Sequence, residues 1–378
     1  MRENKDYLIT EKPSRALLIF SIPMIIGNLF QQAYTIVDSA IVGRYVGETA
    51  LAAVGASYAL TSIFICIAIG GGIGASVIIS HHFGAHNYGR MKTGIRTALL
   101  SFLFISLILG GIGLIFSQQI MEVLNTPADA IDIAVTYLNI YFLGLPFLFM
   151  YNILSSMFNA LGESRIPLYL LIFSSVLNIF LDLYMVAVLN LGVAGAAYAT
   201  FIAQGISAVL SLIIFVVTLQ KLPGKADGWL SKTEFSDMSR IALPSILQQS
   251  TVSIGMMLVQ SVVNSFGTQI LAGFSAAMRI ESLCVVPMSA IGNAMSSYTA
   301  QNIGAEKEER ISQGYRTGNF MIIIIAVILC LFLEIAHKPL IALFLDNAAS
   351  SQAIVTGESY LKFIGFFFCM IGFKMAVD

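Results

Sequence analysis

Ten apolar runs, each long enough to cross a bilayer and separated by polar clusters, constrain this chain more than any other feature of its sequence. A helix needs about 20 residues to cross a hydrocarbon layer of about 30 Å. The runs cover residues 16–39, 52–79, 97–117, 133–157, 166–189, 195–218, 241–263, 270–298, 319–336 and 354–375. Only 11% of the 378 residues are charged, against about 25% in a typical soluble protein. We therefore predict an all-α polytopic membrane protein.

Positive charges divide unevenly between the loops that join these runs. Lys and Arg favour the cytoplasmic side of membrane proteins. Sixteen of the 20 fall at the N-terminus or in alternate loops, whereas only Arg44 and Lys338 fall in the remaining loops. We therefore expect a multi-pass protein with its N-terminus in the cytoplasm. The net charge of −1 offers no basic excess for nucleic acid, so no nucleic-acid partner is expected.

The sequence repeats itself at an offset of 220 residues. The loop SHHFGAHNYGRMKTGIRT at 80–97 aligns with AQNIGAEKEERISQGYRT at 300–317, and six positions are identical: Gly84 and Gly304, Ala85 and Ala305, Arg90 and Arg310, Gly94 and Gly314, Arg96 and Arg316, Thr97 and Thr317. Both loops carry the cytoplasmic charge bias. The repeat therefore predicts two parallel helical bundles related by a pseudo-two-fold axis along the membrane normal, which is a transporter architecture.

The repeat also predicts the domain organisation. We expect a six-helix N-terminal lobe at 1–218, a cytoplasmic linker at 219–240 and a four-helix C-terminal lobe at 241–378. Counterparts of the spans at 166–189 and 195–218 do not follow in the second half. The sequence is therefore expected to lack the last two helices, either in nature or by truncation.

Two aspartates lie where a membrane span is expected. A carboxylate inside a bilayer costs about 2.5–3.5 kcal/mol on the insertion scale, so such residues are functional candidates. Asp38 ends the first span, and Asp182 lies deep in the fifth. Tyr34 and Asn178 each precede an acid by four residues and share its helix face. Such a set of oxygens can exchange a proton for a monovalent cation.

Other polar residues fit structural roles better. Arg279 and Glu281 lie two residues apart in the eighth span and do not share a helix face, but each could neutralise a neighbour on another helix, so we expect a structural role for both. His81, His82 and His86 correspond in the repeat to Gln301, Asn302 and Glu306, so no metal site is expected there. No predicted span contains a histidine or a clustered catalytic set, so the sequence does not favour an enzyme.

Several segments resemble one transporter family. These are IPMIIGNLFQQAYTIVDSAIVGRYVGETALAAVG in the first span and its loop, FGAHNYGR and its repeat IGAEKEER, NIFLD in the fifth span, and AAMRIESLCVVPMSAIGNAMSSYTAQNIGA in the eighth. In this order they resemble bacterial members of the multidrug and toxic-compound extrusion (MATE) family over nearly the whole chain. Family members have twelve helices in two six-helix lobes around a central cavity.

The resemblance implies a secondary active exporter of amphipathic cationic drugs in the inner (plasma) membrane of a bacterium, working as a monomer by alternating access without a cofactor. It implies antiport with a proton or sodium gradient. The implied cation-coupling residues are Asp38, Asn178, Asp182, Thr200, Tyr34 and Tyr137, and the implied substrate-binding residues are Asn152 and Gln31. Some family branches carry an acid in the seventh helix, but PSILQQSTVSIGMMLVQSVVNSF has none.

Two alternatives stay open at this point. A flippase for lipid-linked oligosaccharides, from the same broad superfamily, would need a basic cavity to hold pyrophosphate. Within the predicted spans the only basic residues are Arg279, Lys362 and, at the cytoplasmic end of the last span, Lys374, which argues against that function. The other alternative is a transporter that is inactive because its second lobe is incomplete.

Overall fold

The computed structural model describes residues 6–46, 48–124, 126, 130–343 and 350–377 of the chain. Within these ranges the regular structure is helical. The elements are α1 (Tyr7–Thr10), α2 (Pro13–Tyr45), α3 (Glu48–Gly84), α4 (Tyr88–Val123), α5 (Ile131–Ala160), α6 (Arg165–Asp182), the π-helix η1 (Leu183–Val188), α7 (Gly192–Gln220), α8 (Lys232–Asn264), α9 (Thr268–Gly304), α10 (Glu308–Ala342) and α11 (Ser351–Val377).

The predicted all-α membrane fold is confirmed. Ten helical segments in the described part of the chain are long and apolar enough to cross a membrane, and each overlaps one predicted span. Most of these helices extend beyond the apolar runs because their ends carry polar residues that still form helix. The extension places His81 and His82 at the end of α3 and His337 inside α10, outside the spans predicted from hydropathy.

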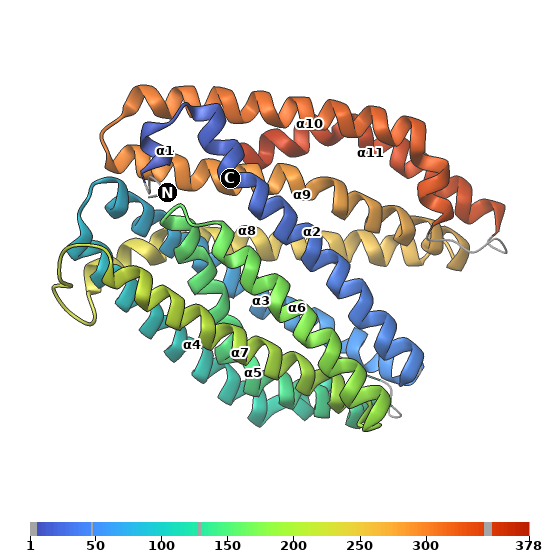
Figure 1. Cartoon of the computed structure of the whole chain (residues 1–378). Helices are drawn as coiled ribbons and strands as arrows, with labels where there is room; N and C mark the ends of the chain where they lie inside the picture. The colour runs from blue at the N-terminus through green and yellow to red at the C-terminus, as the bar shows by residue number, and fades with distance from the viewer. Residues whose placement is uncertain (1–5, 47, 125, 127–129, 344–349, 378) are drawn as a thin grey trace. The chain divides into compact units, whose positions relative to one another are not determined.

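The repeat at an offset of 220 is also visible in the helix boundaries. The starts of α3, α4 and α5 are each separated by 220 residues from the starts of α9, α10 and α11. The packing repeats as well, because α5 contacts α3 and α4 just as α11 contacts α9 and α10. Figure 1 shows α9, α10 and α11 running side by side.

The chain forms two compact units. The first unit contains Met1–Leu29 and Thr251–Asp378, and the second contains Phe30–Ser250. Two long helices, α2 and α8, therefore contribute one half to each unit. The predicted lobe boundaries at 218 and 240 follow the sequence repeat instead, and they stay a prediction.

Each unit has its own apolar core. In the first unit, side chains of α9, α10 and α11 such as Met288, Ile322 and Phe368 are fully buried. In the second unit, α3, α4 and α5 contribute to two cores around Phe158 and Phe142, and α6, α7 and α8 add side chains to the first of these. Close helix packing depends on small residues, since a Cβ on Gly273 of α9 would clash with the carbonyl oxygen of Ala353 on α11.

Candidate functional site

Two aspartates from helices far apart in the sequence meet inside the second unit. Asp182 is the last residue of α6 and is fully buried, whereas Asp38 on α2 is half-buried. Their carboxyl groups lie within hydrogen-bonding reach of each other. Two carboxyls this close repel when both are ionised, so they are suited to sharing one proton.

An asparagine and a threonine hold one side of this pair. With its nitrogen facing the acid, the Asn178 amide donates to Oδ2 of Asp182 at 2.9 Å. Its oxygen then accepts from the backbone nitrogen and the hydroxyl of Thr200 on α7, each at 3.2 Å. This orientation satisfies both ends of the amide and ties α6 to α7 beside the acid.

Two tyrosines complete the polar cluster. The hydroxyl of Tyr34, one turn before Asp38 on α2, lies within hydrogen-bonding reach of the side chain of Thr200. Tyr137 on α5 lies close enough to interact electrostatically with both Asp38 and Asp182. The six predicted cation-coupling residues therefore come together from α2, α5, α6 and α7.

The backbone changes its helical form directly after Asp182. The next six residues form the π-helix η1, and π turns occur frequently at functional sites. Asn190 after it has a φ of 53°, a left-handed conformation that Asn tolerates better than most residues. Gly195 lets α7 approach this turn, since a Cβ there would lie 3.1 Å from the carbonyl of Met185. Sequence patterns did not predict this turn.

An apolar floor lies beside the cluster. Val42, Val186, Val193 and Ala196 are buried together, and Tyr137 packs against them. No Lys, Arg or His of the described residues forms an ion pair with Asp38 or Asp182. Carboxyl, amide and hydroxyl oxygens next to an apolar floor can hold a proton or a small hard cation without a competing basic side chain.

The two predicted substrate-binding residues lie outside this cluster. Asn152 is 15 residues beyond Tyr137 on α5, about 22 Å along the helix axis, and donates to the carbonyl of Leu148 at 2.8 Å. Gln31 is exposed on α2, two turns before Asp38. The amides of Asn152 and Gln31 therefore lie apart from the carboxyl cluster.

Another acid within a predicted span, Glu281, lies in the first unit. Glu281 on α9 accepts a hydrogen bond of 2.6 Å from the hydroxyl of Tyr360 on α11. The repeat places Thr61 at the position equivalent to Glu281, and there the hydroxyl of Tyr141 donates to the backbone oxygen of Thr61 at 3.3 Å. The sequence prediction did not name Tyr360, although alignment of the two halves within one residue would have found it.

Two of the three loop histidines hydrogen-bond different side chains. Nε2 of His82 lies 2.9 Å from Oε2 of Glu234, and Nδ1 of His86 lies 3.0 Å from the hydroxyl of Tyr88. In the described part of the chain, no group of three or more His, Cys, Asp or Glu side chains could hold a metal ion.

A repeated helical bundle with ten potential spans and an intramembrane carboxyl cluster defines a multi-pass membrane transporter. The MatE family model matches residues 23–184 and 244–378. The chain belongs to the MatE family.

Similarity to individual proteins agrees with this membership. The probable multidrug resistance protein YpnP of Bacillus subtilis (strain 168) is 32% identical over 364 residues, which cover 96% of this chain and 81% of the relative. The multidrug export protein MepA of Staphylococcus aureus (strain MRSA252) is 26% identical over 286 residues, covering 74% of this chain and 62% of the relative. The FAD transporter of Shewanella oneidensis is 24% identical over 347 residues, covering 90% and 76%.

Solved structures show the same fold. A crystal structure of MATE in complex with MaL6 matches with a TM-score of 0.91 at 24% identity, covering 99% of this chain and 83% of that one. The outward-facing conformation of a multidrug resistance MATE family transporter of the MOP superfamily matches with a TM-score of 0.88 at 25% identity and the same coverage.

Proposed function

We propose that this chain is a secondary active exporter of amphipathic organic cations, working by antiport with protons or sodium ions. The export part of the proposal is supported by relatives that are named multidrug resistance or multidrug export proteins. The antiport part rests on one observation, the Asp38–Asp182 pair held by Asn178 and Thr200. We further propose that the protein lies in a bacterial plasma membrane as a monomer, with its N-terminus in the cytoplasm.

The chemistry follows from the carboxyl pair. When one proton is shared, the cluster carries about one negative charge, and a second proton or a sodium ion neutralises it. Asn178, Thr200 and Tyr34 supply the further oxygens, and Asn178 and Thr200 also fix Asp182 in place. Loading the cluster therefore changes the hydrogen bonds between α2, α6 and α7.

Export requires the ion and the drug to favour different conformations. We propose that ion entry rearranges α2, which contains Pro23. Proline lacks a backbone N–H, so the carbonyl of Ile19 has no helical partner and α2 can bend there. Gln31 and Asn152 would contact the drug rather than the ion.

Ethidium efflux from whole cells tests this proposal. We collapse the proton gradient and the sodium gradient separately and expect only one of these treatments to stop efflux. That treatment identifies the coupling ion. Asp38→Asn and Asp182→Asn should each reduce efflux at least about 100-fold, because either change removes the charge that the ion neutralises.

Asp132→Asn is the matched control, since Asp132 is an exposed acid in the first turn of α5. It should export like the parent. Parent-like efflux by the Asp38 and Asp182 variants would contradict the proposed antiport site, and loss of efflux in the control would mean that the assay reports folding instead.

A further inference from the structure

The α3–α4 loop and the helix ends beside it, together residues 80–97, hold the segment that leads into α8. We call residues 222–234 the α8 lead-in. Nζ of Lys92 donates to the carbonyl oxygens of Leu222 and Gly224 at 2.7 and 2.8 Å. Two threonine hydroxyls of α4 accept from backbone nitrogens of the lead-in, Thr93 from Asp227 at 2.9 Å and Thr97 from Ser231 at 3.0 Å. The contacts form a row along α4 and fix the path of the α8 lead-in.

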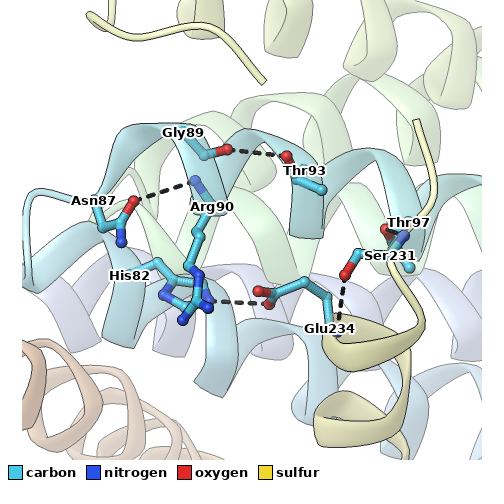
Figure 2. Close-up of polar contacts among 8 residues, drawn as sticks. All are labelled: His82, Asn87, Gly89, Arg90, Thr93, Thr97, Ser231 and Glu234. Carbon is cyan, nitrogen blue, oxygen red and sulfur yellow. Dashed lines mark hydrogen bonds and ion pairs between the residues drawn. The ribbon is translucent and has the colours of Figure 1, made fainter. Parts of the chain in front are cut away.

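A buried pair closes one end of this row (Figure 2). His82 at the end of α3 lies 2.9 Å from Glu234 in the first turn of α8, and both side chains are buried. The Ser231 hydroxyl accepts from the backbone nitrogen of Glu234 at 3.3 Å, so Ser231 caps the start of α8. Further along, the Arg96 guanidinium stacks on Trp229 at 4.7 Å.

The α9–α10 loop and the helix ends beside it, together residues 300–317, hold the segment that leads into α2. We call residues 7–11 the α2 lead-in. The Arg310 guanidinium donates to the carbonyl oxygens of Leu8 at 3.1 Å and Glu11 at 2.6 Å. Its Nε donates to Oδ1 of Asn302, whose amide donates to Leu8 at 3.1 Å. Nζ of Lys307 donates to the carbonyl of Ile9 at 2.8 Å.

We call the contacts on the α8 lead-in and those on the α2 lead-in the two clamps. They form at the same place in the 220-residue repeat. His82 and Asn302 occupy the same repeat position, and each contacts a lead-in or the helix start that follows it. The lead-ins are exchanged between the repeats. The α3–α4 loop of the first repeat holds the start of the second repeat, and the α9–α10 loop of the second repeat holds the start of the first. The two clamps therefore share their place in the repeat but use different side chains.

The exchange explains how the two units divide the chain. The first half of α2 belongs to the unit whose α9–α10 loop holds its lead-in, and the first half of α8 belongs to the unit whose α3–α4 loop holds its lead-in. Each of these two helices then continues into the other unit. Any movement between the units must therefore be absorbed inside α2 and α8, unless a clamp opens.

We propose that both clamps stay closed throughout transport, and that Arg310 and the His82–Glu234 pair are positioning residues that fix the clamped ends of α2 and α8. The link to transport rests on the proposed function. If the clamps stay closed, α2 and α8 bend during the transport cycle while their lead-ins stay in place.

The first test needs no substrate. Thr97 is fully buried beneath the α8 lead-in, so Thr97→Cys in a background without the native cysteines reports whether the lead-in lifts. We expect N-ethylmaleimide to leave this cysteine unlabelled in membrane vesicles, with or without an ion gradient. Lys225→Cys, at an exposed position of the same lead-in, is the control that should label fully. Labelling of Thr97→Cys that appears when a gradient is applied would overturn the proposal.

The second test tethers the clamp. Thr97→Cys with Ser231→Cys places two thiols where a hydroxyl now meets the neighbouring backbone nitrogen. After mild oxidation, with the disulfide verified by mass, we expect ethidium efflux within about twofold of the reduced form, because a closed clamp loses nothing by being locked. Each single cysteine variant controls for the oxidant. Efflux that stops on oxidation and returns on reduction would overturn the proposal.

The third test weakens each clamp. Arg310→Lys keeps the charge but cannot reach two carbonyls and Asn302 together, so we expect the maximal efflux rate to fall about tenfold at equal expression. The ethidium concentration for half-maximal efflux should not change. Glu234→Ala should act similarly by leaving His82 buried without an acceptor, and Glu234→Gln should restore efflux because its amide oxygen still accepts.

The controls separate this proposal from the proposed function. Failure of the parent to export ethidium would count against the proposed function, while the maleimide test would still decide whether the clamps open. Parent-like efflux by Arg310→Lys and Glu234→Ala would show that the clamps do not position α2 and α8 for transport.

Discussion

Asn178 holds Asp182 from one turn earlier on the same helix, with its amide nitrogen 2.9 Å from the carboxyl oxygen Oδ2. A hydrogen bond to an ionised group contributes about 1.5–3 kcal/mol, so Asn178 is expected to set how tightly the cluster binds its ion.

Removing this amide should weaken ion binding more than drug binding. For Asn178→Ala we expect the ion concentration that gives half-maximal ethidium efflux to change at least about tenfold, with a smaller change for ethidium. Efflux measured across a series of ion concentrations tests this. Asn264→Ala is the control, because Asn264 is exposed at the end of α8 and contacts Gln260. An unchanged ion dependence in Asn178→Ala would refute the role.

Gln31 and Asn152 should give the opposite pattern. Both amides lie outside the carboxyl cluster, so Gln31→Ala and Asn152→Ala are expected to raise the ethidium concentration for half-maximal efflux about three- to tenfold. The ion dependence should stay like that of the parent. The same two titrations measure both quantities, and a shift in the ion dependence instead would assign these residues to ion binding.

Glu281 is expected to be structural. In Glu281→Gln the amide oxygen still accepts from Tyr360, so expression and efflux should stay within about twofold of the parent. In Glu281→Leu the Tyr360 hydroxyl loses this acceptor, at a cost of about 1–3 kcal/mol, and the melting temperature in detergent should fall. Loss of efflux in a well-folded Glu281→Gln would identify a second ion site instead.

Gly273 is expected to be intolerant of any side chain. Gly273→Val would push α9 away from the carbonyl of Ala353 on α11, and overpacking of this kind costs about 1–3 kcal/mol or more. We expect lower yield of folded protein and a lower melting temperature. Gly111→Ala is the control because a Cβ at Gly111 of α4 meets no atom within 4 Å. Equal melting temperatures for the two variants would contradict the packing argument.

Hydropathy and self-similarity predicted the membrane fold well because both are encoded in residue type and spacing. Ten apolar runs became ten spans, and the 220-residue offset recurs in the helix starts. The contact between Asn178 and Asp182 could be expected from helical spacing, since both residues lie on one helix face.

Other parts of the site could not be predicted this way. Spacing alone could not bring Asp38 to Asp182, because that contact joins different helices, and the family resemblance supplied it. The π turn after Asp182 depends on tertiary packing that leaves no periodic signal. The clamp contacts were missed because most acceptors are backbone carbonyls, which every residue carries.

The exchanged lead-ins also impose an order on biosynthesis. Arg310 contacts the carbonyl of Glu11, and these residues are 299 positions apart, so the α2 lead-in leaves the ribosome long before the side chain that holds it. The α8 lead-in, by contrast, meets its partners after about 130 positions. The α2 lead-in therefore stays without these contacts until the start of α10 has been made, and until then it remains available to chaperones or proteases.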